Sequence, residues 1–427
     1  MMSKNEPLRS FVLGADDSLF SLYNLPYGIF QPIANNTPRV GVAIGDWVCD
    51  LAILEEQGLL AVSAAEPIFA RSSLNYFASL GLQVWSAIRE RLQSLLSLEN
   101  PLLQENTGLL EKVLVPQKAV KLLLPFDIGA FTDFYASEHH ASHVGRLFRP
   151  NDNPLLPNWK RLPVAYNGRA STVFVSGTPI RRPNGQIKPS IDAVDPIFSP
   201  SRKLDFEVEL GFFVGVGNAD GKPITVDKAA SHIFGCVLLN DWSARDIQAF
   251  EYQPLGPFLS KSFGTSISPW VVPYMALEPA MAPLGKQDPK PLPYLYQEHP
   301  QQPAVQLQVD IRPHDIAQIS TLSQTNSQAL YWSMEQMLAH HTVNHCIMQP
   351  GDLLATGTIS GHEKTSLGCL LEITSNGKEP VQLDGGVQRT FLEDGDAVII
   401  SGYCETPHAK IGFGSVEGTI LPADPLI

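Results

Sequence analysis

The sequence has few cysteines, and none of them form a closely spaced pair. Its five cysteines are scattered, and no two have the C-x-x-C spacing found in many zinc and thiol–disulfide sites. An odd number of distant cysteines favours reduced thiols in a reducing compartment. The opening MMSKNEPLRS lacks the apolar core of a signal peptide, and no run of about 18 apolar residues is available to cross a bilayer. We therefore expect a cytoplasmic protein without a membrane segment.

Positive charge is also scarce. The formal net charge is −13 and no run of five basic residues occurs, so nucleic acid and anionic membranes are unfavoured partners. The stretch GPFLSKSFGT does not match a Walker A loop, and no G-x-G-x-x-G follows a strand pattern. These absences argue against nucleotide-binding folds and leave the many acidic residues to be explained.

The pattern of the sequence changes near Pro125. A chain of 427 residues is long enough for two or three domains. Before Pro125, short strand patterns such as RVGVAIGDWVCDL are followed by helical ones such as LQVWSAIRERLQSLL, whereas strand patterns dominate afterwards. We predict a mainly β (α+β) protein, with a small β-rich domain with helices at 1–125 and a domain of folded-over sheets at 126–427.

The stretch KLDFEVELGFFVG, residues 203–215, has an unusual acidic pattern. Asp205, Glu207 and Glu209 alternate with apolar residues, so in an extended strand the three carboxylates share one face. Like charges side by side destabilise a sheet. The pattern therefore indicates a positive partner at this face.

A second polar pattern follows in LLNDWSARDIQAFEY. Asp241, Arg245, Gln248 and Tyr252 recur at helical spacing and would form one stripe of a helix. One interpretation is a solvated face with an Asp to Arg pair four residues apart. The other is a helix whose carboxylate, guanidinium, amide and phenol line a cavity.

The third pattern is a group of histidines in FTDFYASEHHASHVGRLFR. His139 and His143 have H-x-x-x-H spacing, but His140 stands where the metalloprotease motif requires Glu. Zinc is therefore the weaker interpretation, and a surface or structural role is the commoner one for such a group.

Several long motifs together resemble the fumarylacetoacetase family, the fumarylacetoacetate hydrolases. TDFYASEHHA, LDFEVELGFFVG, LLNDWSARDIQAFEY and PGDLLATGTISG occur in order, and LYNLPYGIF extends the similarity into the first part of the chain. The resemblance implies an N-terminal SH3-like barrel domain, a C-terminal domain of rolled β-sheets and a homodimer. It also implies hydrolysis of 4-fumarylacetoacetate to fumarate and acetoacetate, the last step of tyrosine and phenylalanine catabolism.

The resemblance further implies a divalent-cation site. The family's ligand positions fall on four carboxylates of this sequence: Asp133, Glu207, Glu209 and Asp241. Such an all-oxygen, anionic set suits Ca²⁺ or Mg²⁺. Asp205 is outside this set, and we expect a solvated or hydrogen-bonded strand end there. A weaker additional cation environment falls on Lys261, Gly264 and Thr265.

The same resemblance assigns catalytic roles. His140 with Glu372 corresponds to the family's pair that activates water, and the donors for the developing oxyanion fall on Arg245, Gln248 and Lys261. The neighbouring His139 leaves a shift of the base by one residue open, although the alignment on HA favours His140.

The substrate implied is a small diketo acid with two carboxylates. The family's substrate-contacting positions fall on Tyr135, Arg149, Tyr166, Arg245, Gln248, Tyr252 and Thr358. Two alternatives stay open: a hydrolase of another acylpyruvate or 1,3-diketo acid, and a divalent-cation-binding protein without enzymatic activity.

Overall fold

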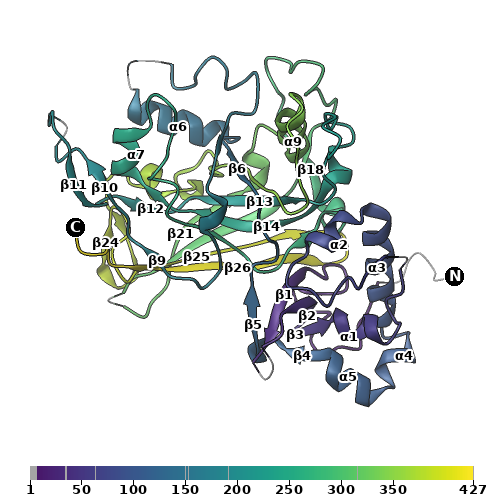
Figure 1. Cartoon of the computed structure of the whole chain (residues 1–427). Coiled ribbons are helices and arrows are strands. Elements are labelled where there is room, and N and C mark those ends of the chain that lie inside the picture. Colours follow the sequence, from purple (N-terminus) through teal and green to yellow (C-terminus); the bar gives the residue numbers. More distant parts are fainter. Residues whose placement is uncertain are drawn as a thin grey trace.

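The N-terminal part of the computed structural model is built on a curled antiparallel sheet (Figure 1). The structure describes residues 7–33, 36–62, 64–149, 151, 153–190, 192–314 and 316–426. The five strands pair in the order β4-β3-β2-β1-β5. Their bounds are β1 (Tyr27–Pro32), β2 (Arg39–Ile44), β3 (Trp47–Asp50), β4 (Leu114–Pro116) and β5 (Val120–Leu123). Gly45, with φ of 53°, begins the two-residue turn between β2 and β3, where a residue with a side chain would be strained.

Five short helices cover this half-barrel. They are α1 (Leu51–Glu56), α2 (Asn75–Ser79), α3 (Leu82–Leu95), α4 (Pro101–Gln104) and α5 (Thr107–Val113). The Asp50 side chain accepts from the Ala52 and Ile53 amides and so caps α1. On α3, Trp85 reaches the larger domain and packs edge-on against Phe234, with 5.3 Å between ring centroids.

A central mixed sheet organises the larger domain. Its order is β7-β6-β22-β13-β14-β16-β8, with β17 also paired to β14, and the β6–β22 and β16–β8 pairs are parallel. The strands are β6 (Phe131–Phe134), β7 (Ala165–Asn167), β8 (Val173–Val175), β13 (Val208–Val214), β14 (Ile233–Asp241), β16 (Thr265–Ile267), β17 (Val272–Pro273) and β22 (Leu353–Ala355). Every residue of β13 and β14 is buried, so these two strands lie inside the core.

A second sheet packs beside β14 and completes the rolled architecture. Its order is β21-β20-β25-β26-β9, and β14 contacts both β25 and β26. The strands are β9 (Ile180–Arg181), β20 (Val305–Arg312), β21 (Ser320–Asn326), β25 (Ala397–Glu405) and β26 (Lys410–Leu421). The predicted fold class, mainly β with a curled N-terminal domain and a rolled-sheet C-terminal domain, is confirmed.

Small ribbons and helices surround these sheets. The two-stranded ribbons pair β10 (Asn184–Ile187) with β11 (Ile197–Pro200), β12 (Leu204–Asp205) with β15 (Ser243–Ala244), β18 (Met281–Pro283) with β19 (Gln301–Pro303), and β23 (Val381–Gln382) with β24 (Gln388–Arg389). The helices are α6 (Glu138–Phe148), α7 (Arg245–Glu251), α8 (Tyr274–Leu277), α9 (Met334–Thr342) and α10 (Leu370–Ile373). In Figure 1, α6 and α7 lie on the same side of the central sheet.

The single helical stripe expected from Asp241 to Tyr252 is not formed. Asp241 is the last residue of β14, and α7 begins only at Arg245. The apolar run before Asp241 continues as a buried strand up to the aspartate itself, which sets the strand end. Asp241 and Arg245 therefore reach the same region from a strand and a helix.

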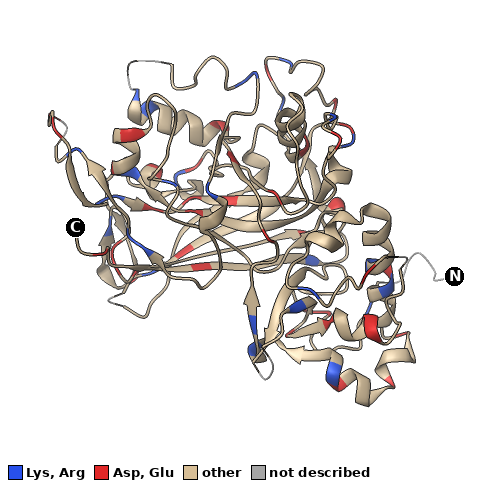
Figure 2. Cartoon of the chain, in the orientation of Figure 1, with Lys and Arg blue, Asp and Glu red and all other residues tan. Residues whose placement is uncertain are grey.

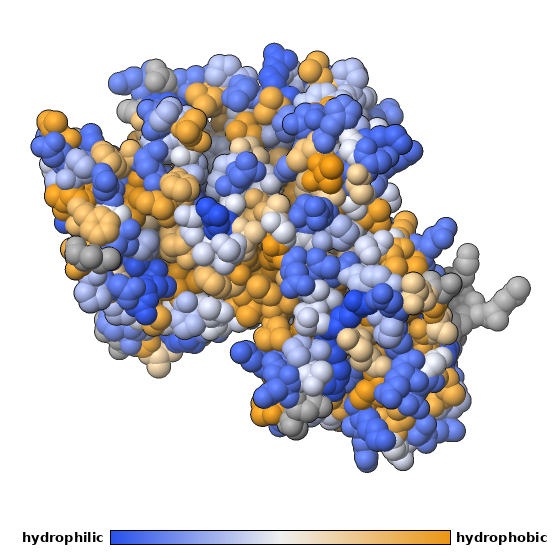
Figure 3. Space-filling model, viewed as in Figure 1, coloured by the Kyte–Doolittle hydropathy of each residue, from blue (hydrophilic) through white to orange (hydrophobic). Residues whose placement is uncertain are grey.

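Most of the face drawn in Figure 3 is hydrophilic, with apolar side chains gathered in the recess between the two domains. The described helices include none long and apolar enough to cross a membrane.

Gly145 on α6 provides a test of how this helix is seated. A Cβ at Gly145 would lie 2.0 Å from the Pro154 carbonyl oxygen, whereas a Cβ at Gly108 on α5 would meet nothing within 4 Å. Gly145→Ala should therefore lower the free energy of unfolding by roughly 1–3 kcal/mol. Gly108→Ala should be neutral or stabilise by up to about 1 kcal/mol, since alanine favours helix. Urea unfolding of both variants measures this, and equal effects at the two positions would contradict the close approach.

Candidate active site

Four carboxylates from three strands meet inside the larger domain. Asp133 lies on β6 and Glu209 lies on β13. Glu207 immediately precedes the first residue of β13, and Asp241 is the last residue of β14. One oxygen of each lies within 4.8 Å of the others, and all four residues are buried. Acidic residues on these interior strands are visible beneath α6 and α7 in Figure 2. The strand alternation that predicted a shared acidic face therefore holds for Glu207 and Glu209.

Several oxygens of this acidic cluster lack a hydrogen-bond donor. Oδ1 of Asp133 and both carboxylate oxygens of Glu209 are buried without a partner among the described residues. Burial, together with the neighbouring Asp241, holds the pKa of Asp133 well above its ordinary value. Burial and the charge of Asp133 do the same for the pKa of Glu209. Orphaned oxygens in an all-carboxylate set fit a hard divalent cation.

Two basic side chains neutralise part of the acidic cluster. Lys261 Nζ donates to Glu207 and, at 2.7 Å, to Asp241 Oδ2. Arg245 Nη1 lies 2.7 Å from Glu207 Oε1. Although burial opposes ionisation, Lys261 and Arg245 lower the pKa of Glu207 to about 2. Arg245 also pairs with Asp205, so these two cations leave part of the negative charge of the acidic cluster uncompensated.

Asp205 faces away from the acidic cluster. It is completely buried, and its carboxylate accepts from Arg245 Nε at 2.8 Å and from the Leu370 and Leu371 amides at 2.7 and 2.9 Å. Asp205 ends β12, and Phe206 and Glu207 separate it from β13. It is thus a hydrogen-bonded strand end that connects Arg245 to the start of α10.

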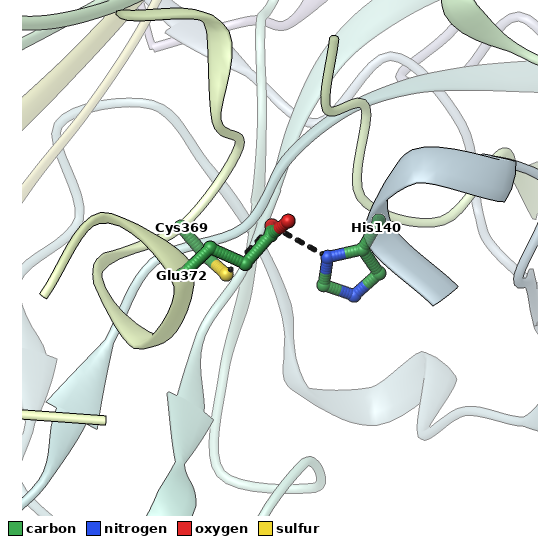
Figure 4. A group of neighbouring side chains, drawn as sticks. All are labelled: His140, Cys369 and Glu372. Atoms are coloured by element: carbon green, nitrogen blue, oxygen red, sulfur yellow. Dashed lines mark hydrogen bonds and ion pairs between the residues drawn. The ribbon is translucent and has the colours of Figure 1, made fainter. Parts of the chain in front are cut away.

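A histidine and a glutamate form a second buried unit (Figure 4). Nδ1 of His140 lies 2.7 Å from Oε2 of Glu372, and both side chains are almost fully buried. The Ser360 hydroxyl and the Cys369 thiol donate to the same oxygen at 2.6 and 3.3 Å. Burial opposes ionisation here, but His140 and the hydrogen bonds from His143 and Ser360 hold the pKa of Glu372 well below its ordinary value. Because an ionised carboxylate only accepts, Nδ1 of His140 carries a proton, and in the neutral imidazole Nε2 is then the acceptor.

The other two histidines of α6 differ in what they contact. The ring of His139 faces His362, with 5.6 Å between centroids, and burial together with His362 lowers the pKa of His139. Nδ1 of His143 lies 2.9 Å from Oε1 of Glu372. In the part of the chain that the structure describes, the histidine-containing group that could hold a metal is His140 with Cys369 and Glu372, not the H-x-x-x-H pair. The side chains of that group already hydrogen-bond to one another, with His140 and Cys369 both bound to Glu372.

A cavity of about 360 Å³ opens onto both units. Its volume is in the range of small-molecule sites. Its lining includes the following residues expected from the sequence: Asp133, Tyr135, His140, Arg149, Tyr166, Glu207, Arg245, Gln248, Tyr252, Lys261 and Thr358. Glu209, Asp241 and Glu372 stand directly behind them. Apolar side chains such as Phe148, Trp159 and Leu371 complete the walls.

Two further expected positions, Gly264 and Thr265, are also outside the lining. Thr265 begins β16, and its hydroxyl donates to Asp241 Oδ1 at 2.8 Å, so it acts behind the carboxylate. A Cβ added at Gly264 would contact the side chains of Ile180 and Trp242. No local pattern in the sequence points to Ser360, Cys369 or His143 as partners of Glu372, because each pairing depends on contacts that form only in the folded chain.

Two family models of the fumarylacetoacetate hydrolases together match most of the chain. The family model described as "Fumarylacetoacetate (FAA) hydrolase C-terminal" matches residues 129–421, and "Fumarylacetoacetase N-terminal" matches residues 23–125. Fumarylacetoacetase of Homo sapiens is 49% identical over 415 residues, covering 97% of this chain and 99% of the relative. Fumarylacetoacetase of Arabidopsis thaliana is 50% identical over 421 residues, covering 98% and 99%. The chain therefore belongs to the fumarylacetoacetase family.

A solved structure shares the fold at low identity. Fumarylacetoacetate hydrolase from psychrophilic Exiguobacterium antarcticum has a TM-score of 0.53 and 16% identity, covering 93% of this chain and 99% of that one.

The raised pKa values in the acidic cluster predict how pH acts on metal-free protein. A carboxyl whose folded pKa is raised stabilises the fold below its unfolded pKa, and this contribution is lost as pH rises through the folded pKa. Glu209→Gln imitates the protonated form at every pH. With a chelator present, the melting temperature of the wild type should therefore fall, compared with that of Glu209→Gln, as pH rises from about 5 to about 8. A difference that stays constant across this range would contradict the raised pKa of Glu209.

Proposed function

We propose that the chain hydrolyses a carbon–carbon bond of 4-fumarylacetoacetate, giving fumarate and acetoacetate in tyrosine and phenylalanine catabolism, at the cavity described above. Fumarylacetoacetase activity follows from the nearly full-length similarity to relatives of that name. The observation that carries the site assignment is that the His140–Glu372 pair and the acidic cluster reach one cavity. A base and a candidate cation site that reach one cavity suit addition of water to a dicarbonyl compound.

The proposed cofactor is Ca²⁺ or Mg²⁺, held by Asp133, Glu207, Glu209 and Asp241. The orphaned oxygens of Asp133 and Glu209 support this set. When bound, the cation would supply Lewis-acid stabilisation of the negative charge that develops on a 1,3-dicarbonyl. Lys261 and Thr265 act on the same site by donating to Asp241. The weaker additional cation environment at Lys261, Gly264 and Thr265 stays a proposal from the family resemblance.

The proposed base is His140. Its Nε2 takes a proton from water, whose oxygen then bonds to the ketone carbon, while Glu372 stabilises the imidazolium. The carbon–carbon bond breaks with its electron pair on the acetoacetate fragment, and the imidazolium returns the proton to that fragment. The new carboxyl group of fumarate releases its remaining proton to solvent, so atoms and charge balance with water as the only other reactant.

The oxyanion needs donors that are not already engaged. Nη2 of Arg245 is buried and has no hydrogen-bond partner among the described residues, although Arg245 lines the cavity. We assign Arg245, Gln248 and Lys261 to stabilise the oxyanion of the tetrahedral intermediate. Asp205 and Glu207 hold the Arg245 guanidinium in place from two sides.

The substrate's carboxylates require a cationic or hydroxyl-bearing wall. Nε of Arg149 is buried and has no hydrogen-bond partner within the described part of the chain, while its Nη2 donates to the Pro154 carbonyl at 2.9 Å. This supports carboxylate binding by Arg149. The other substrate contacts in the proposal are Tyr135, Tyr166, Tyr252 and Thr358, all of which line the cavity.

A division of the chain near Pro125 and assembly as a homodimer complete the proposal. The two family models support the division, because one ends at residue 125 and the other begins at residue 129.

Metal removal tests the proposed cofactor. Exhaustive chelation should abolish loss of the substrate's 1,3-dicarbonyl absorbance, because the uncompensated acids repel each other and the dianionic substrate. Ca²⁺ or Mg²⁺ should restore turnover, and at about 100 times Kd should add about 2.7 kcal/mol to stability. Na⁺ at equal ionic strength is the control. Full activity in protein shown by elemental analysis to be metal-free would remove the cation from the mechanism.

Two asparagine variants test the base. Asparagine keeps an N–H near the position of histidine Nδ1 but offers nothing at Nε2. His140→Asn should therefore lower kcat roughly 100-fold or more, with little change in KM or metal content, and should lose the acid limb of the kcat profile. His139→Asn, whose ring faces His362, should be mild. A severe loss in His139→Asn with near-normal turnover in His140→Asn would move the role to His139.

A further inference from the structure

Glu372 lies between two histidines of one helix. His140 and His143 are three residues apart on α6 and therefore share a face. Their Nδ1 atoms bind different oxygens of Glu372, His140 at Oε2 (2.7 Å) and His143 at Oε1 (2.9 Å). The His140 side chain is 3% exposed, whereas that of His143 is 30% exposed. One imidazole thus lines the cavity and the other reaches solvent.

We propose that His143 is a positioning residue for the base: as a neutral donor to Oε1 of Glu372, it fixes the carboxylate and limits how strongly Glu372 stabilises protonated His140. The inference rests on the proposed function, since it takes His140 as the base. It adds a residue that the resemblance did not select.

The electrostatic argument concerns how Glu372 distributes its charge. A carboxylate stabilises a neighbouring imidazolium in proportion to the negative charge left on it, and each added donor takes up part of that charge. Oε2 already receives His140, Ser360 and Cys369, while among the described residues His143 is the donor to Oε1. Without His143, more charge stays on Glu372, His140 holds its proton more tightly, and the free base is available only at higher pH.

The geometric argument concerns rotation of the carboxylate. With donors on both oxygens, turning Glu372 about its terminal bond would break at least two hydrogen bonds. The lone donor on Oε1 comes from the same helix as the base, so movement of α6 carries both imidazoles together. His143 therefore helps to hold the plane of the carboxylate toward His140.

Other ionisable groups surround the pair but stay the same in every variant below. They are Tyr135, Glu138 and His139 on or before α6, Glu207 before β13, His362 after β22, and Cys369 at the start of α10. Glu138 pairs with Lys160 at 2.5 Å. Of these groups, Cys369 alone hydrogen-bonds to Glu372 within the described ranges.

Two substitutions of His143 separate the effect of its N–H donor from the effect of its possible positive charge. His143→Asn keeps an N–H near the position of Nδ1 but cannot ionise, and His143→Leu removes the donor. In the metal-loaded full-length enzyme, the acid limb of the kcat profile should move to higher pH in His143→Leu by roughly half to one pH unit. In His143→Asn the limb should stay near that of wild type. His139→Asn, on the same helix and facing His362, is the matched control and should leave the limb in place.

A spectroscopic readout keeps this test independent of turnover. In selectively labelled protein, the ¹⁵N signals of the His140 ring should titrate at higher pH in His143→Leu than in wild type or His143→Asn. Coincident titration of His140 in all three proteins would overturn the proposal. Equal displacement in the Asn and Leu variants would also overturn it, because the charge of His143 and not its donor would then be responsible. A wild type without turnover would defeat the proposed function, whereas the titration comparison would still decide the role of His143.

Discussion

Four carboxylates buried within a few ångströms of one another set the charge balance of the whole site. Removing charges from water is costly unless each finds an opposite charge or a donor. Lys261 joins Glu207 to Asp241, and Arg245 joins Glu207 to Asp205. Among the described residues neither cation pairs with Asp133 or Glu209, whose charge, when ionised, a divalent ion held there would neutralise.

This charge balance extends beyond the acidic cluster. Arg245 binds Asp205, and Asp205 in turn accepts the Leu370 and Leu371 amides at the start of α10. The same short helix carries Glu372, which holds His140 on α6. Hydrogen bonds and the short helix α10 together therefore link the acidic strands to the base, although the two units lie on elements far apart in the sequence. The position of each unit depends on the other.

The N-terminal domain contributes to the site by packing, not by side chains in the cavity lining. Along β13, Glu209 and Phe213 lie on the same face because strand side chains alternate. Phe213 stacks on Phe126, with 4.3 Å between ring centroids, in the core shared with the N-terminal domain. One end of this face is thus covered by the smaller domain, and the other end carries the acids that reach the cavity.

Local patterns in the sequence determined the mainly β fold, the two-residue turn at Gly45 and the shared face of Glu207 and Glu209, because strand alternation and turn geometry depend on neighbouring residues. The family motifs predicted the wider set of site residues. Only the tertiary structure decided three points. Asp205 leaves the acidic face because β12 ends there, Asp241 belongs to a strand and not to the helix of Arg245, and His140 rather than His139 meets Glu372. His143 could not be selected from the sequence at all, since its partner is 229 positions away and helical spacing fixes only the face on which a side chain lies, not what that face meets.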